Sequence, residues 1–341
     1  MKSKAYWQSD MEKAVEEQFT DEVIETSARF FGVELSILKK LGEAENYVFE
    51  ICYDGAPAIL RITHSSHRSL EQIEGELDFV AFLYKEGVRV CRPISSNGKR
   101  ICIHSCSDGS AFYSCLFEKA PGERVVPDGP EWKSDLFHEW GKTISLLHLA
   151  ADQLKKSSAA PARPEWDEEE LLDIERFKQR PGNAVLQQKE RLLQMLRSLP
   201  RHDFGLIHSD LHTGNFHWHD RALHLFDFDD SSYHWFASDL AIPLYYYAWG
   251  LERKGENSFE DKCSCFFHEL IKGYETKRCY SSEMATSIPI FLKLRDFVLY
   301  VYFHKKYDEA KWDKAMKEVV GNLQRRIESN LPIVSIGGSF D

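Results

Sequence analysis

The segment from residue 207 to residue 232 constrains the fold more than any other part of the chain. It reads IHSDLHTGNFHWHDRALHLFDFDDSS, with His208, Asp210 and Asn215 at the spacing H-x-D-x-x-x-x-N. A run of alternating apolar and polar residues around a polar turn follows, and Asp227 comes directly after it. Such alternation predicts a β-hairpin. The hairpin would bring Asp227 back beside the loop that carries Asp210 and Asn215.

These residue types are the ones that phosphoryl transfer requires. A carboxylate orients the attacking hydroxyl and accepts its proton, while an amide oxygen and a second carboxylate hold the metal ions that neutralise phosphate charge. We therefore predict that Asp210 is the catalytic base and that Asn215 and Asp227 bind Mg²⁺. Protein kinases carry the segment D-F-G at this place, and its counterpart here is Asp227-Phe228-Asp229, with Asp229 in the position of the glycine.

Two other interpretations of the segment compete with this one. Asp and Asn residues commonly serve turns, so the segment could be an ordinary hairpin. It could also hold zinc, because four histidines crowd into it. A helix that aligned two of them would be interrupted at Gly214, and the region after Asn215 alternates like a strand. The histidines are His208, His212, His217 and His219.

Composition restricts the class of protein. Hydrophobic residues make up 43% of the 341 residues and charged residues 28%, as in a globular protein with a sizeable core. The net charge of −11 argues against general nucleic-acid binding, which needs a basic surface. No apolar run approaches the ~20 residues that span a bilayer, and residues 1–21 carry no signal-peptide core. We therefore expect a cytoplasmic protein with no membrane partner and with reduced cysteines; the oligomeric state is open.

The motif resembles the signature of the aminoglycoside phosphotransferase and choline kinase-like family, which has the protein-kinase-like fold. That signature reads approximately H-G-D-x-H-x-x-N, then I-D-F, then D-L-A, and its counterparts here are residues 208–215, 226–228 and 239–241. Ser209 replaces the usual Gly and Thr213 a common Pro, and neither change removes a reacting group. The Asp-Phe-Asp-Asp run at 227–230 is closest to homoserine kinase-like and stress-response kinases.

The resemblance implies an α+β fold of two lobes with ATP between them. The N-terminal lobe, residues 1–117, would hold a helix over 11–31, a small five-stranded antiparallel sheet from residue 34 onward, and a helix over 67–87. The C-terminal lobe, residues 118–341, would be mostly helical. Its predicted helices cover residues 132–151, 166–180, 183–199, 235–249, 258–276, 281–305 and 309–330.

Three features of the N-terminal lobe are candidates for nucleotide binding. Gly42 begins the turn 42–46, which in a kinase-like fold covers the phosphates, although a plain hairpin turn explains it equally well. Arg61 lies in the third strand, where kinases place the lysine that contacts phosphates, and a guanidinium can bind phosphate in the same way. The alternative is an arginine of an edge strand in solvent. Glu76 lies on the inward side of the next helix and would pair with Arg61, with Glu74 or Glu71 as substitutes.

The residues around 116–122 mark the change of lobe, because Pro and Gly break the strand there. In the family this crossing binds the adenine edge through the backbone. By position, the carbonyl of Glu118 and the N–H of Ala120 would do so. Backbone contacts leave no side-chain signature that separates ATP from GTP.

The acceptor is expected to be a small molecule with a hydroxyl and an amine. Asp229 and Asp230 directly follow Asp227 and would lie at the mouth of the acceptor pocket, with Asp239 nearby. Asp239 has a second interpretation, as a helix cap or as a residue that holds the catalytic loop. Kinases of this family take amine-bearing alcohols such as choline, aminoglycosides and homoserine.

Two other function classes stay open. Some relatives phosphorylate serine or threonine in proteins, and a nucleotide-binding protein without catalysis would keep only part of the site. The intact Asp210, Asn215 and Asp227 disfavour the second alternative. The short distance from Asp227 to Asp239, with no A-P-E segment or long activation loop, favours a small acceptor over a protein.

Overall fold

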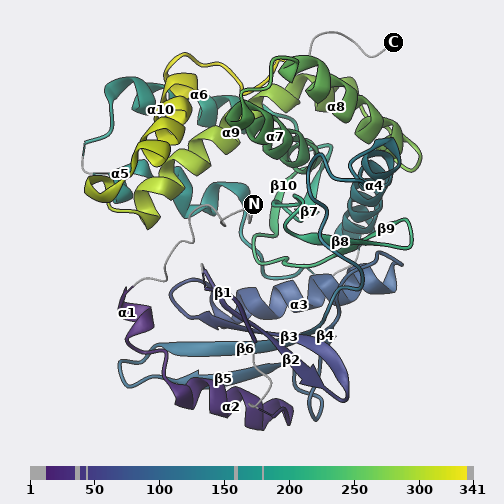
Figure 1. The fold of residues 1–341 in the computed structure, drawn as a ribbon, viewed down its shortest axis with the longest axis vertical. Helices are drawn as coiled ribbons and strands as arrows, with labels where there is room; N and C mark the ends of the chain where they lie inside the picture. Colours follow the sequence, from purple (N-terminus) through teal and green to yellow (C-terminus); the bar gives the residue numbers. More distant parts are fainter. Residues whose placement is uncertain (1–12, 35–38, 44, 157–159, 179, 336–341) are drawn as a thin grey trace. The chain divides into compact units, whose positions relative to one another are not determined.

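A computed structural model describes residues 13–34, 39–43, 45–156, 160–178 and 180–335, and the chain divides into two compact units, residues 1–120 and 121–341. The first unit is built on an antiparallel sheet and the second is mostly helical, which confirms the predicted α+β class (Figure 1). The boundary expected after residue 117 falls inside the last strand of the sheet, Ala111–Glu118. No helix in the described part of the chain combines the length and the apolar character that a membrane span needs.

The sheet of the first unit has six described strands in the order β1-β2-β3-β6-β4, with β5 also paired to β6. The prediction of five strands was wrong by one. The start of the first predicted strand, residues 35–38, lies outside the described residues. The strands are β1 (Lys39–Glu43), β2 (Tyr47–Tyr53), β3 (Ala56–His64), β4 (Pro93–Ile94), β5 (Ile101–Ser105) and β6 (Ala111–Glu118).

A helix covers each face of this sheet: α2 (Asp21–Phe31) on one and α3 (Leu70–Lys85) on the other (Figure 1). Leu60 and Ile62 of β3 are fully buried in the core that includes residues of α2. Side chains along a strand alternate between faces, so Arg61 between them points toward α3. The alternation of the strand thus places the guanidinium of Arg61 on the side of the helix that carries Glu76.

Two predicted helices are interrupted in the structure. The helix expected over 11–31, whose first residues lie outside the described part, is divided into α1 (Lys13–Glu16) and α2, and Phe19 in the break stacks on Tyr47. The helix expected over 166–180 is replaced by two 3-10 turns and the short α5 (Ile174–Phe177). In that segment the side chain of Glu169 accepts the N–H of Leu171 at 3.1 Å, so a local side chain replaces a helical carbonyl.

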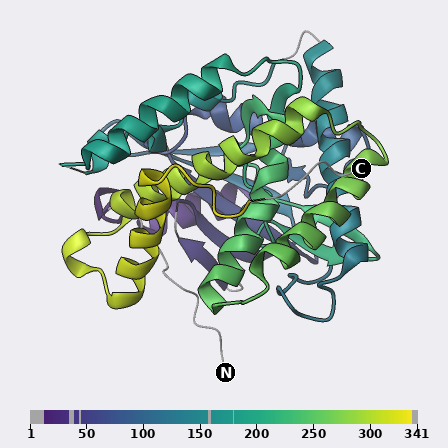
Figure 2. The same cartoon turned by 90° about the horizontal axis from the view of Figure 1, so that it is seen from above.

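The second unit packs its helices around four short strands. Helices α4 and α8 approach so closely that a Cβ at Gly141 would lie 1.7 Å from the carbonyl oxygen of Leu270, which explains the glycine. Helix α9 lies beside α6 and α10, as Figure 2 shows from above. The helices are α4 (Ser134–Lys156), α6 (Asn183–Ser198), α7 (Phe236–Lys254), α8 (Phe259–Glu275), α9 (Ser282–Lys306) and α10 (Lys314–Glu328).

Candidate active site

The segment 207–232 forms the predicted hairpin. Strand β8 (Phe216–His219) pairs with β9 (Ala222–Leu225), while β7 (Phe204–Ile207) pairs with β10 (Ser232–Trp235). The turn residues Asp220 and Arg221 both have positive φ, 48° and 58°, as a two-residue type I′ turn requires. Beyond the hairpin, the N–H of Phe226 donates to the carbonyl of Asn215 at 3.0 Å. The loop 208–215, which enters the hairpin, and the segment that begins at Asp227, which follows it, therefore lie side by side.

Asp210 lies in this loop with both carboxylate oxygens held by other side chains. Its Oδ2 accepts from Nδ2 of Asn215 at 3.1 Å and from Nε2 of His212 at 3.3 Å. Its Oδ1 accepts from a guanidinium nitrogen of Arg295, which comes from α9. The loop also bonds to itself, because Nδ2 of Asn215 reaches the backbone carbonyl of Asp210 at 2.9 Å. The carboxylate is thus fixed in one orientation.

The charges around Asp210 keep it ionised. Burial alone would raise the pKa of this carboxyl, but the neighbouring imidazole of His212 and the guanidinium of Arg295 outweigh burial and hold the pKa below its ordinary value. Arg295 in turn stays protonated because the neighbouring carboxylate favours its charged form. A carboxylate that is ionised and fixed can orient a hydroxyl group and accept its proton.

Asn215 and Asp227 fit a divalent metal ion by their chemistry. Asn215 directs its amide nitrogen to Asp210, so the remaining polar atom of its side chain is the carbonyl oxygen, a ligand suited to Mg²⁺. Asp227 is exposed and has a φ of 64°, which is uncommon outside glycine and frequent at functional sites. The sequence had paired these two residues, and the hairpin brings their segments together.

The histidines of the loop have structural partners. His208 is fully buried; its Nε2–H donates to the carbonyl of Phe226 at 3.2 Å, and its Nδ1 accepts the N–H of Asp210 at 3.4 Å. His212 accepts the N–H of Gly214, where a Cβ would lie 2.4 Å from the imidazole ring. Among the residues that the structure describes, no group of three or more His, Cys, Asp or Glu side chains is arranged to hold a metal. These contacts account for His208 and His212 without zinc.

Asp239 supports the loop from α7. Its side chain is fully buried and accepts the N–H of Ser209 at 2.8 Å, the N–H of His208 at 3.1 Å and Nε2 of His148 at 3.4 Å. Ser209 has a φ of 68°, which explains why the family has glycine there, and its hydroxyl lies 2.8 Å from that of Ser232. The position of Asp239 favours the second interpretation made from the sequence, a residue that holds the loop.

The other acceptor-side candidates differ in exposure. Asp229 is buried, and its backbone carbonyl accepts from Arg163. Asp230 is exposed and lies close enough to Arg295 and Tyr246 for its charge to affect their pKa values. Of the three acidic residues expected near the acceptor, Asp230 alone is exposed in the described structure.

The nucleotide-side candidates lie in the first unit, and two of them pair. Arg61 donates from Nη1 to Oε1 of Glu76 at 2.7 Å and from Nη2 to Oε2 at 2.5 Å, a bidentate geometry. Both side chains are buried, with exposed fractions of 6% and 1%. A buried ion pair of this kind costs desolvation free energy and is weak evidence for stability, which favours a functional reason for it. The solvent-exposed arginine of the alternative interpretation does not describe Arg61.

Three further nucleotide-side candidates lie in the first unit. Gly42, expected in a turn, lies within β1 at a shift of the strand register, so the turn is shorter than predicted; residue 44 lies outside the described part. Glu118 is the last residue of β6, and its side chain accepts Nε of Arg92 at 2.9 Å. Ala120 is buried at the end of the first unit.

Arg295 had no assigned role in the sequence analysis. Arg295 donates to Asp210 and to the hydroxyl of Tyr246, and its guanidinium lies 5.1 Å from the centre of the tyrosine ring. A signal existed, since Arg295 and Asp296 interrupt an apolar run in α9, and buried charges need partners. Which carboxylate Arg295 would meet could not be read from the chain.

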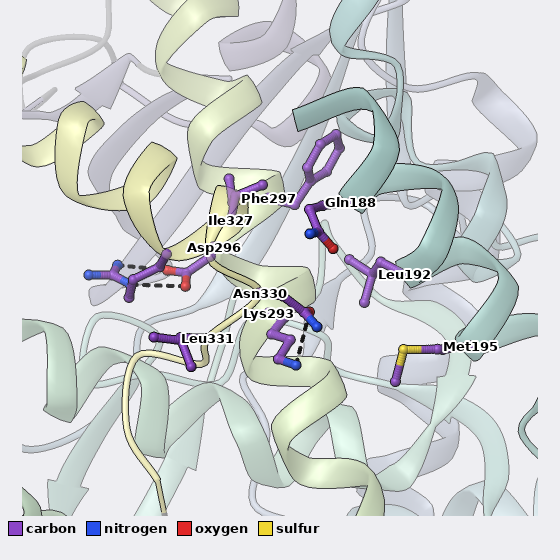
Figure 3. A pocket seen from close by; sticks show the side chains of 10 residues that line it. Gln188, Leu192, Met195, Lys293, Asp296, Phe297, Ile327, Asn330 and Leu331 are labelled. Atoms are coloured by element: carbon purple, nitrogen blue, oxygen red, sulfur yellow. Dashed lines mark hydrogen bonds and ion pairs between the residues drawn. The ribbon is translucent and has the colours of Figure 1, made fainter. Parts of the chain in front are cut away.

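A separate shallow pocket lies between α6, α9 and α10 (Figure 3). Lys293, which lines it, donates to Oδ1 of Asn330 at 3.1 Å. The space open to the centres of water molecules is only about 20 Å³, roughly enough for one water. This pocket is too small for a substrate, and it contains none of the residues predicted to form the site.

Comparisons with known proteins agree with the geometry of the loop. The model of the Phosphotransferase enzyme family matches residues 38–262. Amicoumacin kinase of Bacillus subtilis (strain 168) is 34% identical over 333 residues, which is 96% of this chain and 97% of that protein.

Solved structures show the same relation. An amicoumacin kinase in complex with AMP-PNP, Ca²⁺ and Ami has a TM-score of 0.89 at 32% identity, covering 96% of this chain and 98% of that one. A microcompartment-associated aminopropanol kinase has a TM-score of 0.71 at 19% identity, covering 92% and 100%, and shows the shared fold. The chain belongs to the phosphotransferase enzyme family and is a small-molecule kinase that acts on a hydroxyl group.

Proposed function

We propose that this protein transfers the γ-phosphoryl group of ATP to a hydroxyl of a small, amine-bearing molecule in the presence of Mg²⁺. The observation that carries the proposal is the state of Asp210, a carboxylate held at both oxygens within the loop that matches the family motif. A cytoplasmic location, where ATP is available, belongs to the same proposal.

In this proposal Asp210 orients the acceptor hydroxyl and takes its proton as the oxygen bonds to phosphorus. Asn215 and Asp227 would hold Mg²⁺, which neutralises charge on the phosphates when it is bound. Asp239 is a positioning residue, because it touches the loop and not the reacting atoms. Asp239 is therefore not proposed as a substrate ligand.

On the nucleotide side, we propose that Arg61 contacts the phosphates of ATP and that Glu76 aims it. The bidentate pair supports this role, since it fixes the plane of the guanidinium. The carbonyl of Glu118 and the N–H of Ala120 are proposed to bind the adenine edge, and the β1 strand around Gly42 to cover the phosphates.

The amine on the acceptor is supported by two observations. Asp230 is an exposed carboxylate near the acceptor side of Asp210, within the electrostatic reach of Arg295. Amicoumacin kinase, the relative that is similar over nearly its whole length, makes amicoumacin the first acceptor to test. Asp229 is buried and contributes to the position of its loop more than to the charge at the surface.

The test is an ATP-consumption assay with amicoumacin, amino alcohols, hydroxy amino acids and aminoglycosides as acceptors. For an accepted amino alcohol, the matched control is the analogue that lacks the amine. We expect kcat/KM to be at least about tenfold higher for the amine form, or about 1.4 kcal/mol of discrimination. Equal or better turnover of the neutral analogue would refute the amine requirement. Turnover of unstructured serine or threonine peptides, with none of the small acceptors, would refute the small-molecule assignment.

A further inference from the structure

Tyr246 connects the two side chains that flank the carboxylate of Asp210. Its ring centre lies 4.5 Å from that of His212, which donates to Oδ2, and its hydroxyl accepts from the nitrogen of Arg295 that also donates to Oδ1. One nitrogen of Arg295 therefore has both of its hydrogens in use. One hydrogen of this nitrogen points to Oδ1 of Asp210 and the other to the hydroxyl of Tyr246, so Tyr246 helps to fix the orientation of the guanidinium.

In the part of the chain that the structure describes, the contacts of Asp210 leave one acceptor position of its carboxylate for a substrate. An ionised carboxylate has about four positions that accept hydrogen bonds, two on each oxygen. Asn215 and His212 take the two positions of Oδ2, and Arg295 takes one position of Oδ1. The remaining position is on Oδ1, beside the guanidinium.

We propose that the acceptor hydroxyl binds Oδ1 of Asp210, and that Arg295 and Tyr246 are positioning residues that direct this atom toward it. The inference rests on the proposed function and adds the docking atom and two residues to it. In the reaction, the acceptor O–H bond breaks and its proton passes to Oδ1, while the acceptor oxygen bonds to phosphorus and ADP leaves. Because the transition state of phosphoryl transfer is loose, orientation of the hydroxyl contributes more than the strength of the base.

The neighbouring residues of the same two helices form a second network that serves as a control. The hydroxyl of Tyr245 donates to Oδ1 of Asp296 at 2.7 Å, and Asp296 also accepts two hydrogen bonds from Arg326 of α10. This network is buried between α7, α9 and α10 and does not contact Asp210. Each network has a tyrosine, an arginine and an aspartate, but only the first reaches the catalytic loop.

The experiment compares Tyr246→Phe with Tyr245→Phe, each of which removes one hydroxyl. The measurements are kcat and the KM for ATP with amicoumacin as acceptor, the rate of ATP hydrolysis without it, where water is the acceptor, and the melting temperature. We expect Tyr246→Phe to lower kcat and the hydrolysis rate by about 3–10-fold with little change in the KM for ATP. Tyr245→Phe is expected to lower the melting temperature and leave both rates near the wild-type values.

Substitution of Arg295 is expected to lower the two rates more than substitution of Tyr246. Arg295→Met is expected to lower both rates about 10²-fold, as a displacement of about 1 Å does, and Arg295→Lys to restore part of the loss, because it returns a donor to Oδ1. If Arg295→Met does not fold, the two tyrosine variants decide the question.

The outcomes separate this inference from the proposed function. Asp210→Asn serves as the reference for the catalytic role of the loop. If Asp210→Asn loses turnover while Tyr246→Phe behaves like Tyr245→Phe, the positioning role is refuted and the proposed function stands. If Asp210→Asn keeps both rates, the proposed function fails and the inference fails with it.

Discussion

Replacement of Asp239 by Ala separates the two roles that the sequence left open for this residue. The carboxylate is fully buried and accepts the N–H groups of His208 and Ser209 at 3.1 and 2.8 Å. Burial alone would raise its pKa, but hydrogen bonds from His148 and from the N–H of Ser209 hold the pKa below the ordinary value. The fold therefore contains an ionised carboxylate that stabilises the start of the catalytic loop.

The expected magnitude follows from these contacts. A hydrogen bond to a charged group contributes about 1.5–3 kcal/mol, and a buried N–H left without a partner costs about 1–3 kcal/mol. Three such bonds are lost in Asp239→Ala, two from the backbone N–H groups and one from His148. Removal of one partner from a buried charged network costs about 3–5 kcal/mol, so we expect the free energy of unfolding to fall by about that amount. For a unit of this size, that corresponds to a melting temperature lower by roughly 10 °C. Because the loop carries Asp210, kcat should fall by about 10²-fold as well.

The assay combines calorimetric melting with steady-state kinetics. Asp239→Asn is the matched variant, because it keeps one oxygen and the shape of the side chain, and its melting temperature should lie between those of Asp239→Ala and the wild type. A substrate ligand would behave differently, with a raised KM for the acceptor and unchanged stability. That combination, or wild-type melting and turnover together, would refute the role of Asp239 in holding the loop.

Three further predictions concern the metal site, the ion pair and a buried histidine. Asp227→Ala should abolish binding of Mg-ATP in calorimetry while the protein melts normally, and unchanged affinity would remove Asp227 from the metal site. Glu76→Gln should raise the KM for ATP as Arg61→Met does, with the double variant little worse than either, whereas additive losses would show that the two act separately. Burial lowers the pKa of His234 to about 3 from 6.5, so the unfolded chain binds more protons below pH 6.5 and stability is lost as the pH falls from there toward 3. At pH 5 this amounts to about 2 kcal/mol, and His234→Gln should make denaturant unfolding less dependent on pH over this range; an identical dependence would contradict the assignment.

The geometry of the loop 208–215 and its hairpin could be predicted because the residues involved are close in sequence. The spacing of Asp210 and Asn215 and the hairpin that precedes Asp227 lie within one short segment, so turn and strand rules were sufficient. The pair of Arg61 with Glu76 could also be predicted, because the alternation of a strand and the periodicity of the following helix define their faces.

The contacts made by distant helices could not be predicted from periodicity. Arg295 lies 85 positions after Asp210 and reaches it only because α9 packs on α7. The role of Asp239 could not be assigned for the same reason: an exposed carboxylate could bind a substrate, whereas a buried one holds the loop, and its burial depends on the packing of the helices. The prediction of one helix over 166–180 was wrong for a different reason: acidic side chains such as Glu169 accept backbone N–H groups that a helix would need.

The central claim is that the carboxylate of Asp210 orients the acceptor hydroxyl and accepts its proton during phosphoryl transfer. Asp210→Asn keeps the shape of the side chain and removes its charge, so turnover with ATP and the accepted small molecule is the direct measurement. We expect kcat to fall by about 10²–10⁴-fold, the range of general-base catalysis, while ATP affinity measured by calorimetry changes little. Turnover close to that of the wild type would contradict the account.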